Sequence, residues 1–186
     1  SQPVRYHTTS SSSAIELWVR AEIGSTRLRL SEWNEIQSGD FLLLDRCSYN
    51  LPEKEGLATL KLDEISLFQG KIHHDKIELL DFAIPTEDPM EENDTPESEN
   101  LPMEDTPSSS QEETKSIRDV SFSVCVELAR LRLTLDQLMH LNPGNTLTLP
   151  IHPEQPLNLT VNGEKVAKAE LLQVGDTLGV RILEIS

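Results

Sequence analysis

The side chains best suited to chemistry in this sequence are two adjacent histidines, two cysteines and many carboxylates. His73, His74 and Asp75 are metal-ligand types, but neighbouring residues on a strand point to opposite faces, and no further ligand follows at a usable spacing. We interpret them as a turn and predict no metal site. Cys125 could act as a nucleophile, yet the sequence arranges neither a His or Asp partner nor an electropositive environment for it. We predict that this cysteine is structural.

The acidic residues do not single out a catalytic pair. The chain has 32 Asp and Glu against 16 Lys and Arg, so carboxylate pairs are frequent, and none has the context of a glycosidase-like pair. A solvent-exposed acidic surface is the favoured interpretation. The sequon Asn158-Leu159-Thr160 would need a secretory route that nothing in the sequence indicates. We therefore predict that the protein is not an enzyme and has no catalytic residues and no cofactor.

The negative charge is concentrated in one stretch of the chain. Residues 84–116 contain 11 acidic residues and 1 basic residue, and therefore hold −10 of the formal net charge of −16. The same stretch has five prolines and neither glycine nor an aromatic residue, so it cannot bury enough apolar surface to offset its chain entropy. We predict an acidic disordered linker over 84–116 and, from its polar tract, a disordered lead over 1–13.

The remaining composition excludes several classes of partner. Phosphate contacts need clustered Lys and Arg, whereas both flanking segments are slightly acidic, so we predict neither nucleic acid nor an anionic membrane surface as a partner. No apolar run is long enough to span a bilayer, and no signal peptide opens the chain. Cys47 and Cys125 are too few and too far apart for a disulfide framework. We predict a cytoplasmic protein with reduced cysteines and, because the chain begins with Ser, a domain upstream of this segment.

The segments on either side of the acidic stretch are two copies of one module. At an offset of 105 residues the copies share eight identities without a gap, which chance rarely produces. The first module is assigned to 14–83 and the second to 117–186. The identical pairs are Val19/Val124, Glu22/Glu127, Arg27/Arg132, Leu28/Leu133, Leu30/Leu135, Gly39/Gly144, Leu42/Leu147 and Leu44/Leu149.

The pattern of each copy predicts about five short strands and one short helix. In the second copy, apolar residues alternate over 122–128, and the phase then slips by one residue, which indicates a hairpin turn or a bulge. Thr134 and Gln137 have the spacing of a capping box at the start of a one- or two-turn helix. Asn162-Gly163, flanked by apolar alternation, is the strongest hairpin signal in the chain. The fold class is therefore mainly β.

Modules of about 70 residues are marginally stable alone, because they bury only ~60% of their extended-chain surface. Their apolar strands also leave edges that favour pairing. We predict that the two modules cover each other as an intramolecular pseudo-dimer. The first copy has Asp63-Glu64 where the second has Asn162-Gly163, so we expect specialised, unlike partners rather than two equal ones.

The second copy contains several characteristic segments in a fixed order over about 70 residues: Val126-Glu127-Leu128-Ala129-Arg130, Leu133-Thr134-Leu135, Pro143-Gly144, Leu159-Thr160-Val161-Asn162-Gly163, Ala169-Glu170 and Gly179-Val180-Arg181-Ile182. In these segments the second copy resembles the SpoA (surface presentation of antigens) domain. This family includes the flagellar motor switch proteins and the cytoplasmic ring, or sorting-platform, protein of type III secretion systems. The resemblance implies small, intertwined β-barrel-like modules.

Two modules in one chain resemble the secretion member of the family rather than the single-module flagellar ring protein. The resemblance implies a non-enzymatic scaffold at the cytoplasmic face of a secretion apparatus. It also implies self-association of SpoA modules and docking of other platform components and of the stator-like protein that links the platform to the export ATPase. A short C-terminal product could start internally at Met90 or Met103. A flagellar motor switch-type protein and an unrelated cytoplasmic adaptor remain alternatives.

The resemblance also implies a partner-binding patch at Leu171, Leu172 and Val174. Successive apolar residues on a strand cannot all face one core, so some of them face solvent or a partner. The matching stretch of related single-module proteins carries an exposed hydrophobic docking patch. The alternative is that a second sheet or the sister module buries both faces of this strand.

Overall fold

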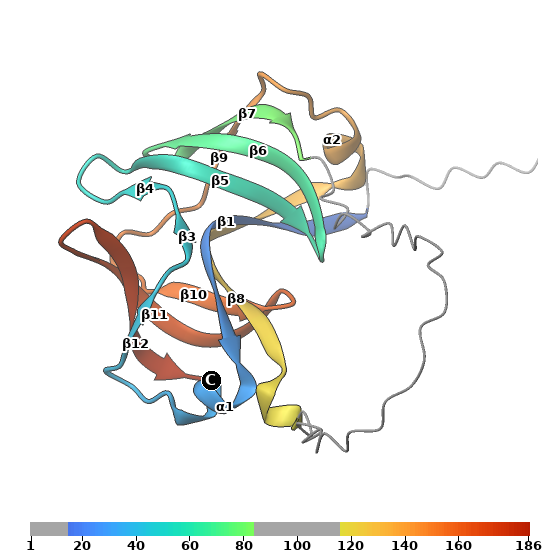
Figure 1. The fold of residues 1–186 in the computed structure, drawn as a ribbon. Coiled ribbons are helices and arrows are strands. Elements are labelled where there is room, and N and C mark those ends of the chain that lie inside the picture. The colour runs from blue at the N-terminus through green and yellow to red at the C-terminus, as the bar shows by residue number, and fades with distance from the viewer. Residues whose placement is uncertain (1–14, 84–115) are drawn as a thin grey trace, which may run out of the picture.

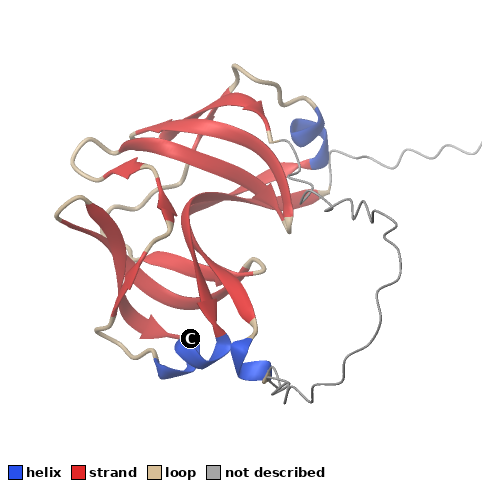
Figure 2. Ribbon diagram, in the orientation of Figure 1, coloured by secondary structure: helices blue, strands red, loops and turns tan. Residues whose placement is uncertain are grey.

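The computed structural model describes residues 15–83 and 116–186, and in these ranges the chain is mainly β (Figures 1 and 2). The first module contains β1 (Glu16–Arg29), α1 (Leu30–Glu35), β2 (Phe41–Leu43), β3 (Arg46–Cys47), β4 (Tyr49–Asn50), β5 (Glu55–Leu62), β6 (Ile65–His73) and β7 (Lys76–Phe82). The second contains the 3₁₀ turn η2 (Ile117–Asp119), β8 (Ser121–Thr134), α2 (Leu135–Met139), β9 (Thr146–Thr148), β10 (Leu157–Val161), β11 (Glu164–Val174) and β12 (Thr177–Ile185).

Several expectations lie outside these ranges. The lead expected over 1–13, both methionines proposed as internal starts, and all of the expected linker except Ser116 are not described by the structure. Ser116 itself caps η2, because its Oγ accepts a hydrogen bond from the backbone N–H of Arg118 at 3.3 Å.

All twelve strands of the described residues belong to one sheet, whose main path runs β2-β12-β11-β10-β8-β1-β5-β6-β7-β9. Both ends of this path are open, so the expectation of barrel-like modules is wrong: the sheet curls but does not close. Figure 1 shows two curved groups of strands, one above the other, joined by β1 and β8, which run through both. The two copies therefore share one folded body.

The pairing of β1 with β8 is the longest contact between the copies. These 14-residue strands run antiparallel from the pair Glu16/Thr134 to the pair Arg29/Ser121. Each copy also gives a short strand to the other, since β2 pairs with β12 and β9 pairs with β7. The ends of the sheet are thus completed across the two modules.

The phase slip seen in both sequences is a bulge and not a hairpin turn. β1 and β8 each continue through it, while their register shifts between Ala21 and Glu22 and again between Glu22 and Gly24. An irregularity of this kind changes which face a strand presents without ending the strand. The expectation of short strands is wrong at this point, because one long strand in each copy replaces two short ones.

The predicted local signals at the helix and the hairpin are confirmed. The hydroxyl of Thr134 accepts from the backbone N–H of Gln137 at 3.1 Å, and the Gln137 side chain accepts from the N–H of Thr134 at 2.9 Å. Asn162 and Gly163 have φ of 50° and 78°, the left-handed values that a tight β-turn of this type requires. The first copy forms the matching hairpin at Asp63-Glu64, where Asp63 has φ of 50°.

The buried apolar residues of both copies form one continuous core. Its members come from β1, β5, β6 and β7 on one side and from β8, β10, β11, β12 and Leu149, just after β9, on the other. Among the largest fully buried side chains of the described residues are Leu60, Ile72, Ile77, Leu79, Leu149, Leu159 and Ile182. We infer that the described ranges unfold together rather than module by module.

Replacing Leu60 by alanine tests this shared core. Leu60 is 0% exposed, whereas Leu57 on the same strand is 50% exposed. We expect Leu60→Ala to lower the free energy of unfolding by about 2–5 kcal/mol through the cavity it leaves. The matched control Leu57→Ala is expected to change it by only about 0.5 kcal/mol. The measurement is urea unfolding followed by both tryptophan fluorescence and far-ultraviolet circular dichroism.

Both tryptophans of the chain, Trp18 and Trp33, lie in the first module, whereas circular dichroism reports on strands of both modules. A single core requires that the two signals give coincident transitions and that both move together in the variant. Two separate transitions, with only one of them shifted, would contradict it.

Candidate protein-docking surface

The residues with the strongest chemical potential do not assemble an active site. His74 and Asp75 form the turn between β6 and β7, as expected from the sequence, and His74 has φ of 57°. The ring of His73 contacts the carboxylate of Glu55 at the exposed surface. Within 15–83 and 116–186, no three His, Cys, Asp or Glu side chains are arranged to hold a metal ion.

Both cysteines have raised pKa values, which is opposite to what a nucleophilic cysteine needs. The pKa of Cys125 rises to about 11, mainly because burial disfavours the thiolate, with a further contribution from the carboxylate of Glu22. Burial also raises the pKa of Cys47. At neutral pH both side chains are therefore protonated thiols.

The features that remain are surfaces, and a row of apolar side chains lies at the β2 end of the sheet. In the register of β2 with β12 and of β12 with β11, Leu43 lies opposite Gly179, and Gly179 lies opposite Leu172. Residues directly opposite one another share a face of the sheet. Phe41 and Val174 lie two residues away from this row on their own strands and therefore face the same way. We call Phe41, Leu43, Leu172 and Val174 the docking face.

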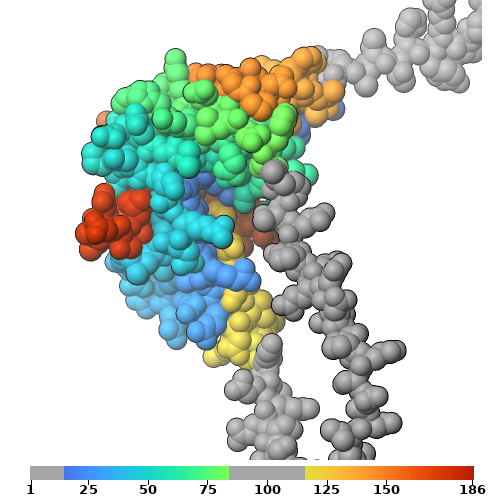
Figure 3. All heavy atoms as spheres, turned by 45° about the horizontal axis from the view of Figure 1, so that its top comes forward, coloured from blue at the N-terminus to red at the C-terminus, as the bar shows by residue number. Residues whose placement is uncertain are grey.

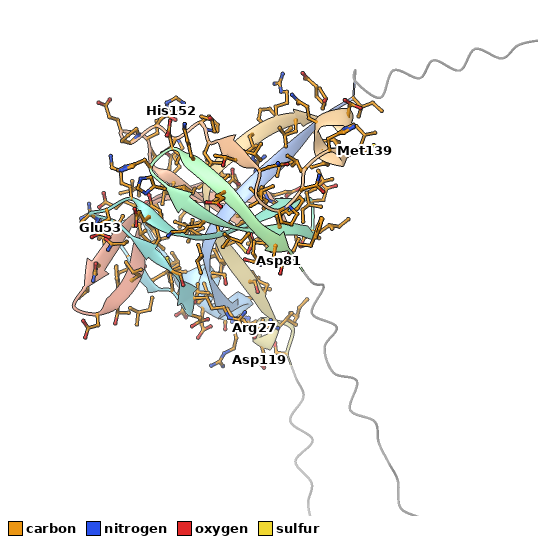
Figure 4. The ribbon with its side chains drawn as sticks, turned by 90° about the horizontal axis from the view of Figure 1, so that it is seen from above. Arg27, Glu53, Asp81, Asp119, Met139 and His152 are labelled. Atoms are coloured by element: carbon orange, nitrogen blue, oxygen red, sulfur yellow. The ribbon has the colours of Figure 1, made fainter. Side chains whose placement is uncertain are left out.

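Three residues of the docking face are exposed, and Leu172 is half-buried. Leu43 and Val174 have exposed fractions of 58% and 60%, and Phe41 is also among the exposed large apolar residues. Figure 3 shows the tip of the β11–β12 hairpin, in red, protruding beside cyan residues of the first module. Glu53, labelled in Figure 4, lies on the same side of the molecule and lines a hollow with Gln173 and Asp176 of this hairpin. Gln173 alternates with Leu172 and Val174 along β11, so this hollow lies on the other face of the strand.

Gly179 lets the Phe41 ring lie against the sheet. A Cβ at Gly179 would be 2.2 Å from Cζ of Phe41, so no larger residue fits while the ring keeps this position. The next row of the same face consists of Phe41, Arg181 and Glu170, and the last two form an ion pair. The Phe41 ring therefore lies between the apolar row at Gly179 and the ion pair Arg181–Glu170.

The matching face at the other end of the sheet is polar. At the offset of the duplication, β9 has Thr146 and Thr148 where β2 has Phe41 and Leu43. These threonines lie opposite Glu78 and Lys76 of β7. Because the two copies have the same strand arrangement at both ends, the difference lies in the side chains alone. In these matching rows the β2 end is therefore apolar and the β9 end is polar.

The structure divides the three residues expected to bind partners between two faces of β11. Leu172 and Val174 belong to the docking face, whereas Leu171 is buried and lines a cavity of about 360 Å³. This cavity lies between the modules, with Tyr49 and Leu51 contributed by the first and Leu128 and Ile151 by the second.

Sequence reasoning missed the contribution of the first module to this surface. Phe41 and Leu43 reach β12 through strand pairing with residues more than 130 positions away, which local periodicity cannot reveal. A signal was present, because an apolar Phe41-Leu42-Leu43 run replaces the Thr-Leu-Thr of the second copy.

Comparison with known proteins finds a family to which the second module is similar. Residues 115–186 match the family described as Type III flagellar switch regulator (C-ring) FliN C-term. The flagellar motor switch protein FliN of Escherichia coli (strain K12) is 36% identical over 69 residues, which are 37% of this chain and 50% of that protein. FliN of Pectobacterium carotovorum is 35% identical over 69 residues, covering 37% of this chain and 65% of that protein.

These matches cover only part of each relative. The chain spans about half the length of the first flagellar relatives that it matches. The flagellar motor switch phosphatase FliY of Bacillus subtilis is 30% identical over 67 residues, which are only 18% of its length.

Among the described residues, no helix has the length and apolar character needed to cross a membrane.

The raised pKa of Cys125 predicts a pH dependence of stability. Because the folded state shifts this pKa from 9.0 to about 11, the folded chain favours the neutral thiol. The stabilisation that the folded state gains from the neutral Cys125 thiol is fully present below pH 9 and is lost as the pH rises through about 11. The free energy of unfolding should therefore fall over that pH window. Urea unfolding at several pH values measures it.

Cys125→Ala is the control, because Tyr49 and Lys61 also have raised pKa values and titrate in the alkaline range. The decline with pH should be smaller in this variant than in the native chain. Equal declines in both proteins would show that Cys125 makes no such contribution.

Proposed function

From the premise that residues 115–186 are a SpoA-type domain related to those of flagellar switch proteins, we propose that this chain is a non-enzymatic scaffold of the cytoplasmic ring, or sorting platform, of a type III secretion system. In this role the two SpoA-type modules pair with each other as an intertwined pseudo-dimer. The paired modules dock the stator-like protein that links the platform to the export ATPase.

The observation that carries the proposal is the composite nature of the docking face. Phe41 and Leu43 come from the first module, and Leu172 and Val174 come from the second. An exposed apolar patch rimmed by charged residues is typical of a protein interaction site. The raised pKa values of both cysteines agree with a binding role rather than a nucleophilic one.

The shape of the surface supports one kind of partner. β2 is three residues long and ends the sheet, so a strand added at this edge would gain few backbone hydrogen bonds. Side-chain contacts must therefore supply most of the affinity. An amphipathic segment that lays apolar residues on Phe41, Leu43 and Val174 suits this face, with a polar flank near the pair Arg181–Glu170.

The proposal extends to the assembly around the chain. We place the protein in the cytoplasm at the face of a secretion apparatus, in contact with other platform components, and in self-association through SpoA modules, including those of a short C-terminal product if one is made. Nucleic acid and membrane are not partners in this proposal, since the modules are slightly acidic.

A flagellar motor switch role is the second candidate. It is favoured by the names of the relatives, all of which are flagellar switch proteins. The secretion role is favoured by the presence of two copies of the module in one chain, because the resemblance to single-module flagellar ring proteins accounts for only one of them. The two candidates differ in which stator-like linker the chain binds.

The test is to titrate the full chain, in separate experiments, with two purified probes and to measure binding by isothermal titration calorimetry. The probes are the stator-like linker of a type III secretion system and its flagellar counterpart. We expect binding to the secretion linker. Leu43→Asp places a charge in the apolar contact and should weaken this binding at least ~10-fold, because a buried interface charge without a partner costs several kcal/mol.

Thr148→Asp is the matched control, since Thr148 occupies the position equivalent to Leu43 at the polar end of the sheet. It should bind like the native chain. Binding of the flagellar linker alone would favour the second candidate. Binding that Leu43→Asp leaves unchanged would remove the docking face from the proposal.

A further inference from the structure

The seam between β1 and β8 has the register of a two-fold arrangement. Arg20 lies opposite Arg130, and Ser25 lies opposite Cys125. The offset of 105 between the copies relates Arg20 to Cys125 and Ser25 to Arg130. Exchanging the two copies therefore converts the pair Arg20/Arg130 into the pair Cys125/Ser25. Each position at the seam can therefore be compared with its counterpart in the other copy.

Arg20 is a buried cation that reaches from the first module into the second. Its exposed fraction is 6%, and its guanidinium donates a hydrogen bond to the backbone carbonyl of Asp63. The same group lies 3.6 Å from the carboxylate of Glu22, which Lys61 also contacts at 2.9 Å. These contacts and its burial fix the position of the guanidinium.

The guanidinium of Arg20 lies where a side chain at Gly163 would begin. A Cβ on Gly163 would be 1.7 Å from Nη1 of Arg20 and 2.9 Å from Cζ. Arg130 approaches the same residue and donates from Nη2 to the carbonyl of Gly163 at 3.0 Å. One arginine from each module therefore converges on this glycine.

Each copy holds only one half of this contact. The first has Arg20 where the second has Cys125, and the second has Gly163 where the first has Glu64. A pair made of two first modules would set each Arg20 against Glu64 instead of glycine. A pair made of two second modules would have glycine on both sides and Cys125 in place of Arg20, so that only Arg130 would approach each glycine.

We infer that Arg20 and Gly163 form a selectivity contact that makes the first module pair with a second module and excludes its pairing with another first module. The contact fills space that only glycine leaves free, and it places a charge that only one copy carries. The inference depends on the strand pairing at the seam and not on the docking face, so the two can fail separately.

A double-mutant cycle in the full chain tests this contact. Gly163→Ala combines the strain of a side chain at positive φ with the clash against Arg20, whereas Gly175→Ala carries only the strain, since Gly175 has φ of 62° and nothing within 4 Å of a built Cβ. We expect Gly163→Ala to lower the equilibrium constant for folding further than Gly175→Ala does, by about 10-fold. Urea unfolding supplies all the values.

Arg20→Lys closes the cycle. Lysine keeps the positive charge beside Glu22 but lacks the guanidinium fork that reaches Gly163. In the Arg20→Lys protein, Gly163→Ala should lower the equilibrium constant for folding only as much as Gly175→Ala does. The decrease caused by Gly175→Ala should be the same with Arg or Lys at position 20. Additive effects of Arg20→Lys and Gly163→Ala would overturn the proposal.

Two glutamate variants test selectivity without the cycle and cover the case in which a double mutant fails to fold. Gly163→Glu introduces the residue that the first copy has at this position, and Gly175→Glu introduces the same side chain at the open turn. The proposal requires that Gly163→Glu lowers the urea midpoint more than Gly175→Glu. An equal or smaller loss would mean that the seam accepts a first-module residue, and the selectivity contact would be rejected.

Discussion

The antiparallel pairing of β1 with β8 is the constraint on which the rest of the molecule depends. Each strand is 14 residues long, and together they form the only continuous ladder that runs through both groups of strands in the described ranges. Without it, each module would have an open edge of apolar strand and a core too small for independent stability. With it, apolar residues from both copies join one core, and the short strands β2 and β9 are brought to the ends of the partner's strands.

This central ladder also explains why so many charged groups are buried near its middle. Glu22 and Glu127 lie opposite each other at the register shift, and both are buried. Two adjacent carboxylates would repel each other, so each is compensated by its own cation, Glu22 by Lys61 and Glu127 by Arg130 at 2.9 Å. Buried ion pairs add little stability over apolar residues but penalise arrangements that leave a charge unpaired. Their effect is therefore mainly on the choice of register and partner.

The sequence predicted the local features well and the long-range pairing poorly. The capping box at Thr134 and the turn at Asn162-Gly163 depend on neighbouring residues, so their chemistry is visible in a short window. The bulge was recognised only as one of two possibilities, because a phase slip looks the same for a bulge and for a turn. The exchange of β2 and β9 depends on which edges remain open after the central strands have paired, and no local pattern encodes that. For this reason the sequence indicated Leu172 and Val174 but not Phe41 or Leu43.

Pairing and docking are energetically linked in this architecture. The proposed docking face contains residues of both modules, so it exists only when β2 has paired with β12. A partner that binds this face binds the paired chain and not a separated one, and it must stabilise the pairing by RT ln(1 + [L]/Kd), about 2.7 kcal/mol at a ligand concentration of 100 times Kd. A pair of second modules would present Thr146 and Thr148 in place of Phe41 and Leu43. In this proposal, divergence of the two copies at a few positions determines both which modules pair and which pair offers an apolar surface.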